Sequence, residues 1–98
     1  METNRLRTVG EREKRLVQAR TSASVRALAA AHGTSQTELG RVLGISQNVV
    51  SKKIRGAVRW SVGDVEAIAM FYGATVDQLT AGPWAWLGLP DDLGALSA

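Results

Sequence analysis

The stretch TSQTELGRVLGISQNVVSKKIRG (residues 34–56) decides the fold of this 98-residue chain. Apolar residues recur three or four positions apart over Gln36–Leu43 and again over Gln47–Arg55, which predicts two short helices. Glycine inside a helix costs about 1 kcal/mol relative to alanine, so Gly40 indicates a crossing that is too close for a side chain. Gly44 provides the left-handed residue that ends the first helix. The stretch therefore predicts two helices joined by a tight turn.

Further helices are expected on both sides of this pair, because capping signals recur. Hydroxyl residues followed three positions later by Glu, Gln or Asp, the capping-box pattern, stand at Thr8, Ser35, Ser61 and Thr75. Glycines suited to ending helices are Gly33, Gly44, Gly56, Gly73 and Gly82. The apolar spacing predicts a helix that ends near His32, a fourth over Val62–Tyr72 and a short fifth around Val76–Leu79. No segment alternates long enough to predict a strand, so the expected fold class is all-α, a compact bundle of about five short helices.

Three segments are expected along the chain. Residues 1–20 form a basic N-terminal arm or a charged helical extension, and the run Thr21-Ser22-Ala23-Ser24 leaves open whether this segment is a separate helix. Residues 21–81 form the main domain, with Trp60, Phe71 and Tyr72 as core or staple residues. Residues 82–98 form an apolar tail that docks on its own domain or on a second copy. The candidate docking residues are Trp84, Trp86, Leu87 and Leu89.

Charge is divided unequally along the chain. Residues 1–59 hold all 12 Lys and Arg against four acids, a net charge of +8, whereas residues 60–98 hold five acids and no base. From Leu39 to Gly63 there is no acid at all. A molecule with one positive and one negative side is expected to bind a polyanion on the positive side only.

Composition and spacing argue against several classes of protein. The chain has no cysteine, no apolar run long enough to span a membrane and no apolar signal stretch near its start, so we expect a soluble cytoplasmic protein. Paired acids, metal-ligand spacing and a phosphate loop are missing, and His32 is the only histidine. We therefore expect no enzyme, no cofactor, no metal and no small-molecule ligand.

The second helix of the opening pair is expected to present polar side chains outward. Val50 and Ile54 must point inward, which leaves amides and cations on the other face. The major groove of DNA admits a helix, and a Gln or Asn amide pairs with adenine through two hydrogen bonds. The candidate base contacts are Gln47, Asn48, Ser51 and Lys52. The candidate phosphate contacts are Gln36, Thr37, Arg41, Ser46, Lys53, Arg55 and Arg59. An N-terminal arm with Arg5 and Arg7 is a candidate for the minor groove.

Residues 36–56 resemble the helix-turn-helix of the lambda repressor and Cro family, often called XRE-like regulators. The match includes Gln36, Leu39-Gly40, Leu43-Gly44-Ile45-Ser46, Val50 and Arg55-Gly56, and its continuation covers about residues 25–81. The resemblance implies that Gln36 binds a phosphate and braces Gln47. One departure is that many members carry isoleucine where Lys53 stands, while Ile54 follows one position later. This leaves open whether Lys52, Lys53 or both face outward.

The resemblance implies a sequence-specific regulator of double-stranded DNA, with a repressor of the phage or prophage type in the cytoplasm of a bacterial host, at the nucleoid, as the main hypothesis. One recognition helix reads few base pairs, so a homodimer on a two-fold site is expected, although a basic arm would extend the footprint of a monomer. An antitoxin or co-regulator that docks a partner through Trp84 and Trp86 is the alternative function. The third possible function is that of a helical adaptor that does not bind nucleic acid.

Overall fold

The structure is a computed structural model that describes the backbone of residues 2–87 and the side chains of residues 10–86. This part of the chain forms six helices and no strand, so the all-α expectation is confirmed. The helices are α1 (Glu2–His32), α2 (Gln36–Leu43), α3 (Gln47–Arg55), α4 (Val62–Tyr72), α5 (Val76–Ala81) and α6 (Pro83–Leu87). Helices α2, α3 and α4 have the predicted bounds, and α5 begins at the predicted Val76 and continues two residues past Leu79.

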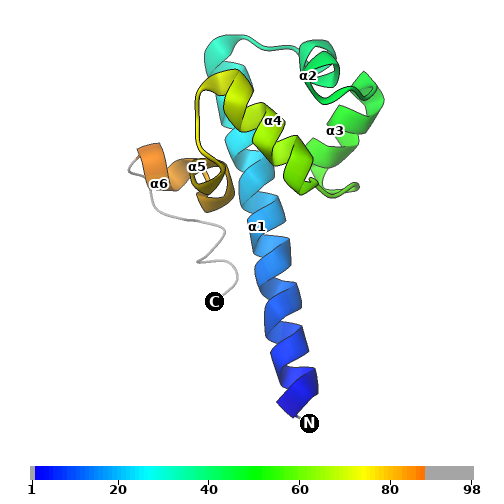
Figure 1. Cartoon of the computed structure of the whole chain (residues 1–98), viewed down its shortest axis with the longest axis vertical. Helices are drawn as coiled ribbons and strands as arrows, with labels where there is room; N and C mark the ends of the chain where they lie inside the picture. Colours follow the sequence, from blue (N-terminus) through cyan, green and yellow to red (C-terminus); the bar gives the residue numbers. More distant parts are fainter. Residues whose placement is uncertain (1, 88–98) are drawn as a thin grey trace.

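Helix α1 is the long axis of the molecule, and the other helices gather around its C-terminal half (Figure 1). Its 31 residues correspond to about 46 Å at about 1.5 Å per residue, which equals the longest extent of the chain, 46 Å. The helix continues through residues 21–24 and through Thr8, so neither a break nor a helix start occurs there. The N-terminal half of α1 therefore projects from the bundle as part of one continuous helix.

The hydroxyl run at residues 21–24 is helical because its side chains are used inside the fold. The Oγ1 of Thr21 donates to the carbonyl of Val17 at 2.7 Å, one turn back in the same helix. The Oγ of Ser24, which is fully buried, donates to the carbonyl of Leu79 at 2.8 Å. That carbonyl lies in the last turn of α5, where helix carbonyls lack a partner within their own helix. The small hydroxyl of Ser24 thus joins α1 to the last turn of α5, in addition to the bond that the same carbonyl accepts from the Gly82 N–H at 3.4 Å.

Gly40 lies against the turn between α2 and α3. A Cβ at this position would lie 2.6 Å from the carbonyl oxygen of Ile45 and 3.5 Å from the backbone nitrogen of Gln47. The crossing expected from the sequence is therefore present, but Gly40 makes room mainly for the backbone of the turn. Gly44 has a φ of 69°, the left-handed conformation that reverses the chain. Ile45 packs against the core and Ser46 caps α3 by accepting from the Val49 N–H at 3.3 Å.

The core collects one or more apolar side chains from each of α1 to α5, namely Val25, Leu39, Val50, Trp60, Val65, Ile68, Ala69 and Leu79. Trp60 is buried beside the capping box of α4, where Ser61 and Asp64 bond reciprocally. Tyr72 packs at the edge of the core. The core expectation for Phe71 was wrong, because 46% of this residue is exposed; the centroid of its ring lies 4.9 Å from that of Tyr72.

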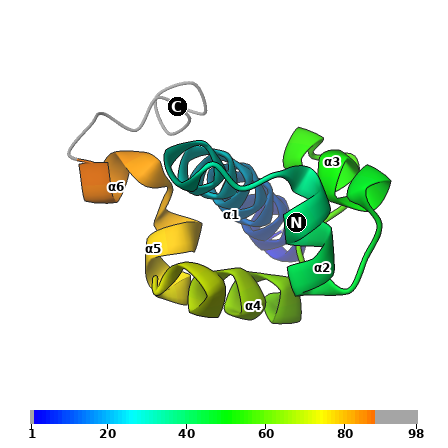
Figure 2. The same cartoon turned by 90° about the horizontal axis from the view of Figure 1, so that it is seen from above.

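The chain after α5 turns back onto its own domain, where α6 packs against α5 and α1. The indole N–H of Trp86 donates to the carbonyl of Gln78 at 3.0 Å, and Trp84 is half-buried. Viewed from above, α6 and α3 lie on opposite sides of α1 (Figure 2). The side chain of Leu87 and all of Leu89 lie outside the described residues. Among the helices of the described region, none is both long and apolar enough to cross a membrane.

Candidate nucleic-acid interface

The outer face of α3 carries the side chains that the sequence assigns to base contact. Gln47, Asn48 and Lys52 are exposed, and Ser51 is half-buried. The opposite face is anchored by Val50, which is completely buried. Asn48, Ser51, Lys52 and Arg55 are spaced three or four residues apart, so they share one side of the helix. The geometry presents amide and cationic groups to solvent along the length of α3.

Gln47 is linked to the preceding helix by a hydrogen bond. The hydroxyl of Thr37 in α2 donates to the Oε1 of Gln47 at 3.2 Å. The bracing partner in the structure is therefore Thr37, whereas the resemblance implied Gln36, which stands next to it and is half-buried. A hydrogen bond of this kind restricts the rotamers of the Gln47 side chain and leaves its amide NH₂ for another acceptor.

Exposed cations surround this face. They are Arg41 on α2, Lys52 and Arg55 on α3 and Arg59 on the loop before α4. The N-terminal turn of α2 lies beside Gln47, as the bond from Thr37 shows, and its backbone N–H groups favour an anion. The exposed acids of the following helices, Glu66 and Asp77, lie on α4 and α5. Positive charge is thus concentrated on α3 and the loop, whereas on α2 the exposed Glu38 offsets Arg41.

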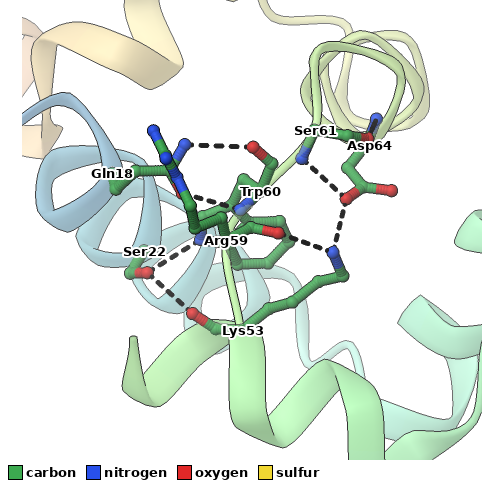
Figure 3. A network of polar contacts seen from close by, with 7 residues as sticks. All are labelled: Gln18, Ser22, Lys53, Arg59, Trp60, Ser61 and Asp64. Atoms are coloured by element: carbon green, nitrogen blue, oxygen red, sulfur yellow. Dashed lines mark hydrogen bonds and ion pairs between the residues drawn. The ribbon is translucent and has the colours of Figure 1, made fainter. Parts of the chain in front are cut away.

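Lys53 differs from its assignment as a phosphate contact, because its side chain turns inward. Only 8% of the residue is exposed. Its ammonium donates to the Oδ2 of Asp64 at 2.7 Å and to the carbonyl of Arg59 at 2.8 Å (Figure 3). The ammonium also lies 5.9 Å from the ring centroid of Trp60. The lysine occupies a core-facing position of α3 because these partners compensate its charge, and Lys52 alone of the two faces outward.

Asp64 serves two helices at once. Its Oδ2 accepts from the backbone N–H of Ser61 at 2.9 Å, which completes the capping box of α4, and it also accepts from Lys53 of α3. Partial burial raises the pKa of Asp64, but the hydrogen bonds from Lys53 and Ser61 and the charge of Lys53 outweigh burial and hold the pKa below its usual value. The ionised carboxylate therefore fixes the distance between the end of α3 and the start of α4.

Two polar residues of α1 hold the loop between α3 and α4, and sequence reasoning missed both. The Nε2 of Gln18 donates to the carbonyl of Trp60 at 3.0 Å, while the Trp60 N–H donates to the Oε1 of Gln18 at 2.6 Å. Ser22 accepts from the indole N–H of Trp60 at 2.8 Å and donates to the carbonyl of Lys53 at 3.1 Å (Figure 3). Their spacing of four residues, which places both on one face of a helix, was the available signal. These contacts set the position of the loop that carries Arg59.

Comparison with known families decides which class of protein carries this arrangement. The family model of the helix-turn-helix domain matches residues 12–81. The chain belongs to this helix-turn-helix family. Membership agrees with the resemblance to XRE-like regulators and indicates a DNA-binding regulator. No curated protein and no solved structure matches the chain.

The helix-turn-helix match begins within α1, at residue 12, and so includes part of the segment that the sequence sets apart as an extension. Arg5 and Arg7 lie in α1 as well. Of the two alternatives expected for this segment, an arm or a helical extension, the backbone takes the helical one, and contact of Arg5 and Arg7 with the minor groove stays a prediction. The N-terminal segment of this helix-turn-helix protein is therefore a helical projection.

Proposed function

We propose that this helix-turn-helix protein is a sequence-specific transcriptional regulator that inserts the N-terminal half of α3 into the major groove of double-stranded DNA. The observation that carries the proposal is the exposed pair Gln47 and Asn48 at the leading end of α3, beside the N-terminus of α2. The first residues of a recognition helix contact base edges in this motif. Gln47 and Asn48 would read adenine, with Ser51 and Lys52 reaching the next base pair or a phosphate.

The backbone of the duplex would lie on the surrounding cations. Arg41, Arg55 and Arg59 are exposed on both sides of the α3 face, and Gln36, Thr37 and Ser46 adjoin the N-termini of α2 and α3. Contacts to phosphates fix the register of a protein on DNA and carry little sequence information. Lys53 is left out of this set, because its ammonium is bonded inside the fold.

We further propose that the protein acts as a repressor, of the type found in phages and prophages, and binds as a homodimer at the nucleoid of a bacterial cytoplasm. A mismatch costs about 1–3 kcal/mol, so the few base pairs under one α3 give too little discrimination within a genome. A two-fold site doubles the number of base pairs read. Selection of bound sequences from a random duplex pool tests this proposal, because a dimer yields a palindrome and a monomer an asymmetric motif.

Binding measurements on the selected site test the role of α3. Gln47→Ala and Asn48→Ala should each weaken binding by about 1–3 kcal/mol and leave affinity for random duplex unchanged. Met70→Ala is the control, because Met70 is 84% exposed in the last turn of α4, at the opposite end of that helix from the Asp64 contact with α3. Affinity should also fall steeply with salt. Equal affinity of the two amide variants and the wild type for the selected site would contradict major-groove reading by α3.

A further inference from the structure

A groove of about 790 Å³ runs along α1, next to the C-terminal end of α3. Its floor is a face of α1 from Glu11 to Arg26, and one side is formed by residues 53–59 of α3 and the following loop. Trp84 of α6 also lines it. This is consistent with the positions of α3 and α6 on opposite sides of α1 (Figure 2). None of the α1 residues along this groove has a role in the site described above, apart from the loop contacts of Gln18 and Ser22.

The described side chains of the groove are strongly basic. Its exposed charged residues are one acid, Glu11, and five cations, Lys14, Arg15, Arg26, Arg55 and Arg59. Arg26 gives one long hydrogen bond, 3.5 Å, to the carbonyl of Ile54, and a guanidinium has five N–H donors in all. Lys53 lines the groove with its stem only, because its ammonium is bonded to Asp64 and Arg59. The exposed cations along the groove therefore favour an extended anionic ligand.

The groove is continuous with the α3 face. Arg55 lines the groove and shares one side of α3 with Asn48 and Lys52. From Lys14 to Arg26 the helix rises by about 18 Å, which equals the rise of about five base pairs along a duplex axis at about 3.4 Å each. A duplex seated on α3 would bring one of its strands past Arg55 toward Lys14 and Arg15.

We propose that this groove binds the sugar-phosphate backbone that flanks the base pairs read by α3, so that α1 is a second DNA-binding element and the footprint exceeds the site under α3. The inference rests on the proposed function and adds a second position of contact on the same DNA. Lys14 and Arg15 are the decisive residues, because they lie on the projecting part of α1 and their side chains are exposed.

The test compares two duplexes, the selected site alone and the same site extended by about ten base pairs, one helical turn, on each side. The double variant Lys14→Gln/Arg15→Gln should bind the extended duplex roughly tenfold or more weakly than wild type, with a salt slope reduced by about two, and bind the short duplex almost normally. Arg41→Gln is the matched control, because Arg41 is exposed on α2 and does not line the groove. It should weaken both duplexes equally.

Ethylation interference locates the contacts. Wild-type binding should be blocked by ethylated phosphates outside the selected bases, and the double variant should lose this sensitivity while it keeps the sensitivity near α2. Equal losses on both duplexes, or no loss, would overturn the inference. Unchanged DNA binding together with lost binding of a poly-glutamate peptide would assign the groove to an acidic protein segment and also overturn it. Failure of the proposed function is distinct, since it appears as wild-type levels of site binding by Gln47→Ala and Asn48→Ala.

Discussion

The ammonium of Lys53 lies 2.7 Å from the Oδ2 of Asp64, and this contact joins the last turn of α3 to the first turn of α4. The same oxygen accepts from the Ser61 N–H. A single carboxylate thus fixes the loop on which Arg59 stands. The interface proposed for DNA thus depends on an ion pair whose lysine turns inward, away from the exposed face of α3.

Asp64→Asn should lower the free energy of unfolding at neutral pH by about 1–3 kcal/mol, because it leaves the Lys53 ammonium without its anionic partner. The pKa of Asp64 is lowered in the folded protein, so the stability that its ionised form contributes is present above the unfolded value, near 3.8, and is lost as pH falls through the folded pKa. Urea unfolding from pH 7 to pH 2 should show the wild type converging on the variant in acid. A constant difference across that range would contradict the role of the charge.

Gly40→Ala should destabilise the fold by about 1–3 kcal/mol, because the added methyl would meet the backbone oxygen of Ile45 at 2.6 Å. Gly63→Ala is the control, since Gly63 lies inside α4 and the nearest atom to an added Cβ would be the hydroxyl of the N-cap Ser61, at 3.8 Å. That change should stabilise by about 0.5–1 kcal/mol, through the higher helix propensity of alanine. Thermal unfolding of both variants measures the contrast, and similar melting temperatures would argue against close packing at the turn.

Ser22→Ala should cost about 1–3 kcal/mol, because it leaves the buried Trp60 indole N–H without its acceptor and removes the hydroxyl that donates to the Lys53 carbonyl. Trp60→Phe removes the same N–H and retains an aromatic ring. A double-mutant cycle of the two changes should give a coupling free energy of about 0.5–1.5 kcal/mol in denaturant unfolding. Strictly additive effects would show that the two side chains do not stabilise each other.

Thr37→Val should reduce discrimination between the selected site and random duplex by about 0.5–1.5 kcal/mol, because the hydroxyl that orients Gln47 is lost. Stability should change little, since Thr37 is exposed. The measurement is the ratio of the two dissociation constants at one salt concentration. If Gln36→Ala alone changes that ratio, the bracing role implied by the family resemblance belongs to Gln36 after all.

The boundaries of α2 to α5 follow from local chemistry, which explains why the sequence predicts them. Ser35, Ser46, Ser61 and Thr75 each accept from a backbone N–H three positions later, and the glycines that end these helices have positive φ. The continuity of α1 depends on partners more than thirty residues away, such as Lys53 for Ser22, and no local pattern contains them. Helix α6 had one local signal, Pro83 at its first position, although the sequence analysis expected only an apolar tail over residues 82–98.

The outward face of α3 was predictable because helical periodicity with Val50 buried determines which residues are exposed. The inward turn of Lys53 was not, because it depends on Asp64, eleven positions further on in another helix. The groove along α1 was equally hidden, since it requires Lys14 and Arg15 to lie near the end of α3 in space. Single elements are encoded locally in this chain, whereas the second basic surface depends on tertiary contacts.

Because α1 is one unbroken helix, its N-terminal half projects from the core as a rigid rod with a fixed direction (Figure 1). The chain contains no cysteine, so Glu13→Cys would provide a unique thiol for a fluorescent label on the projecting half of α1. Glu13 is exposed and does not line the groove. Fluorescence energy transfer from that label to dyes at successive positions on the DNA site would give the orientation of each bound protomer. The direction in which the protein lies on its site becomes measurable without a crystal.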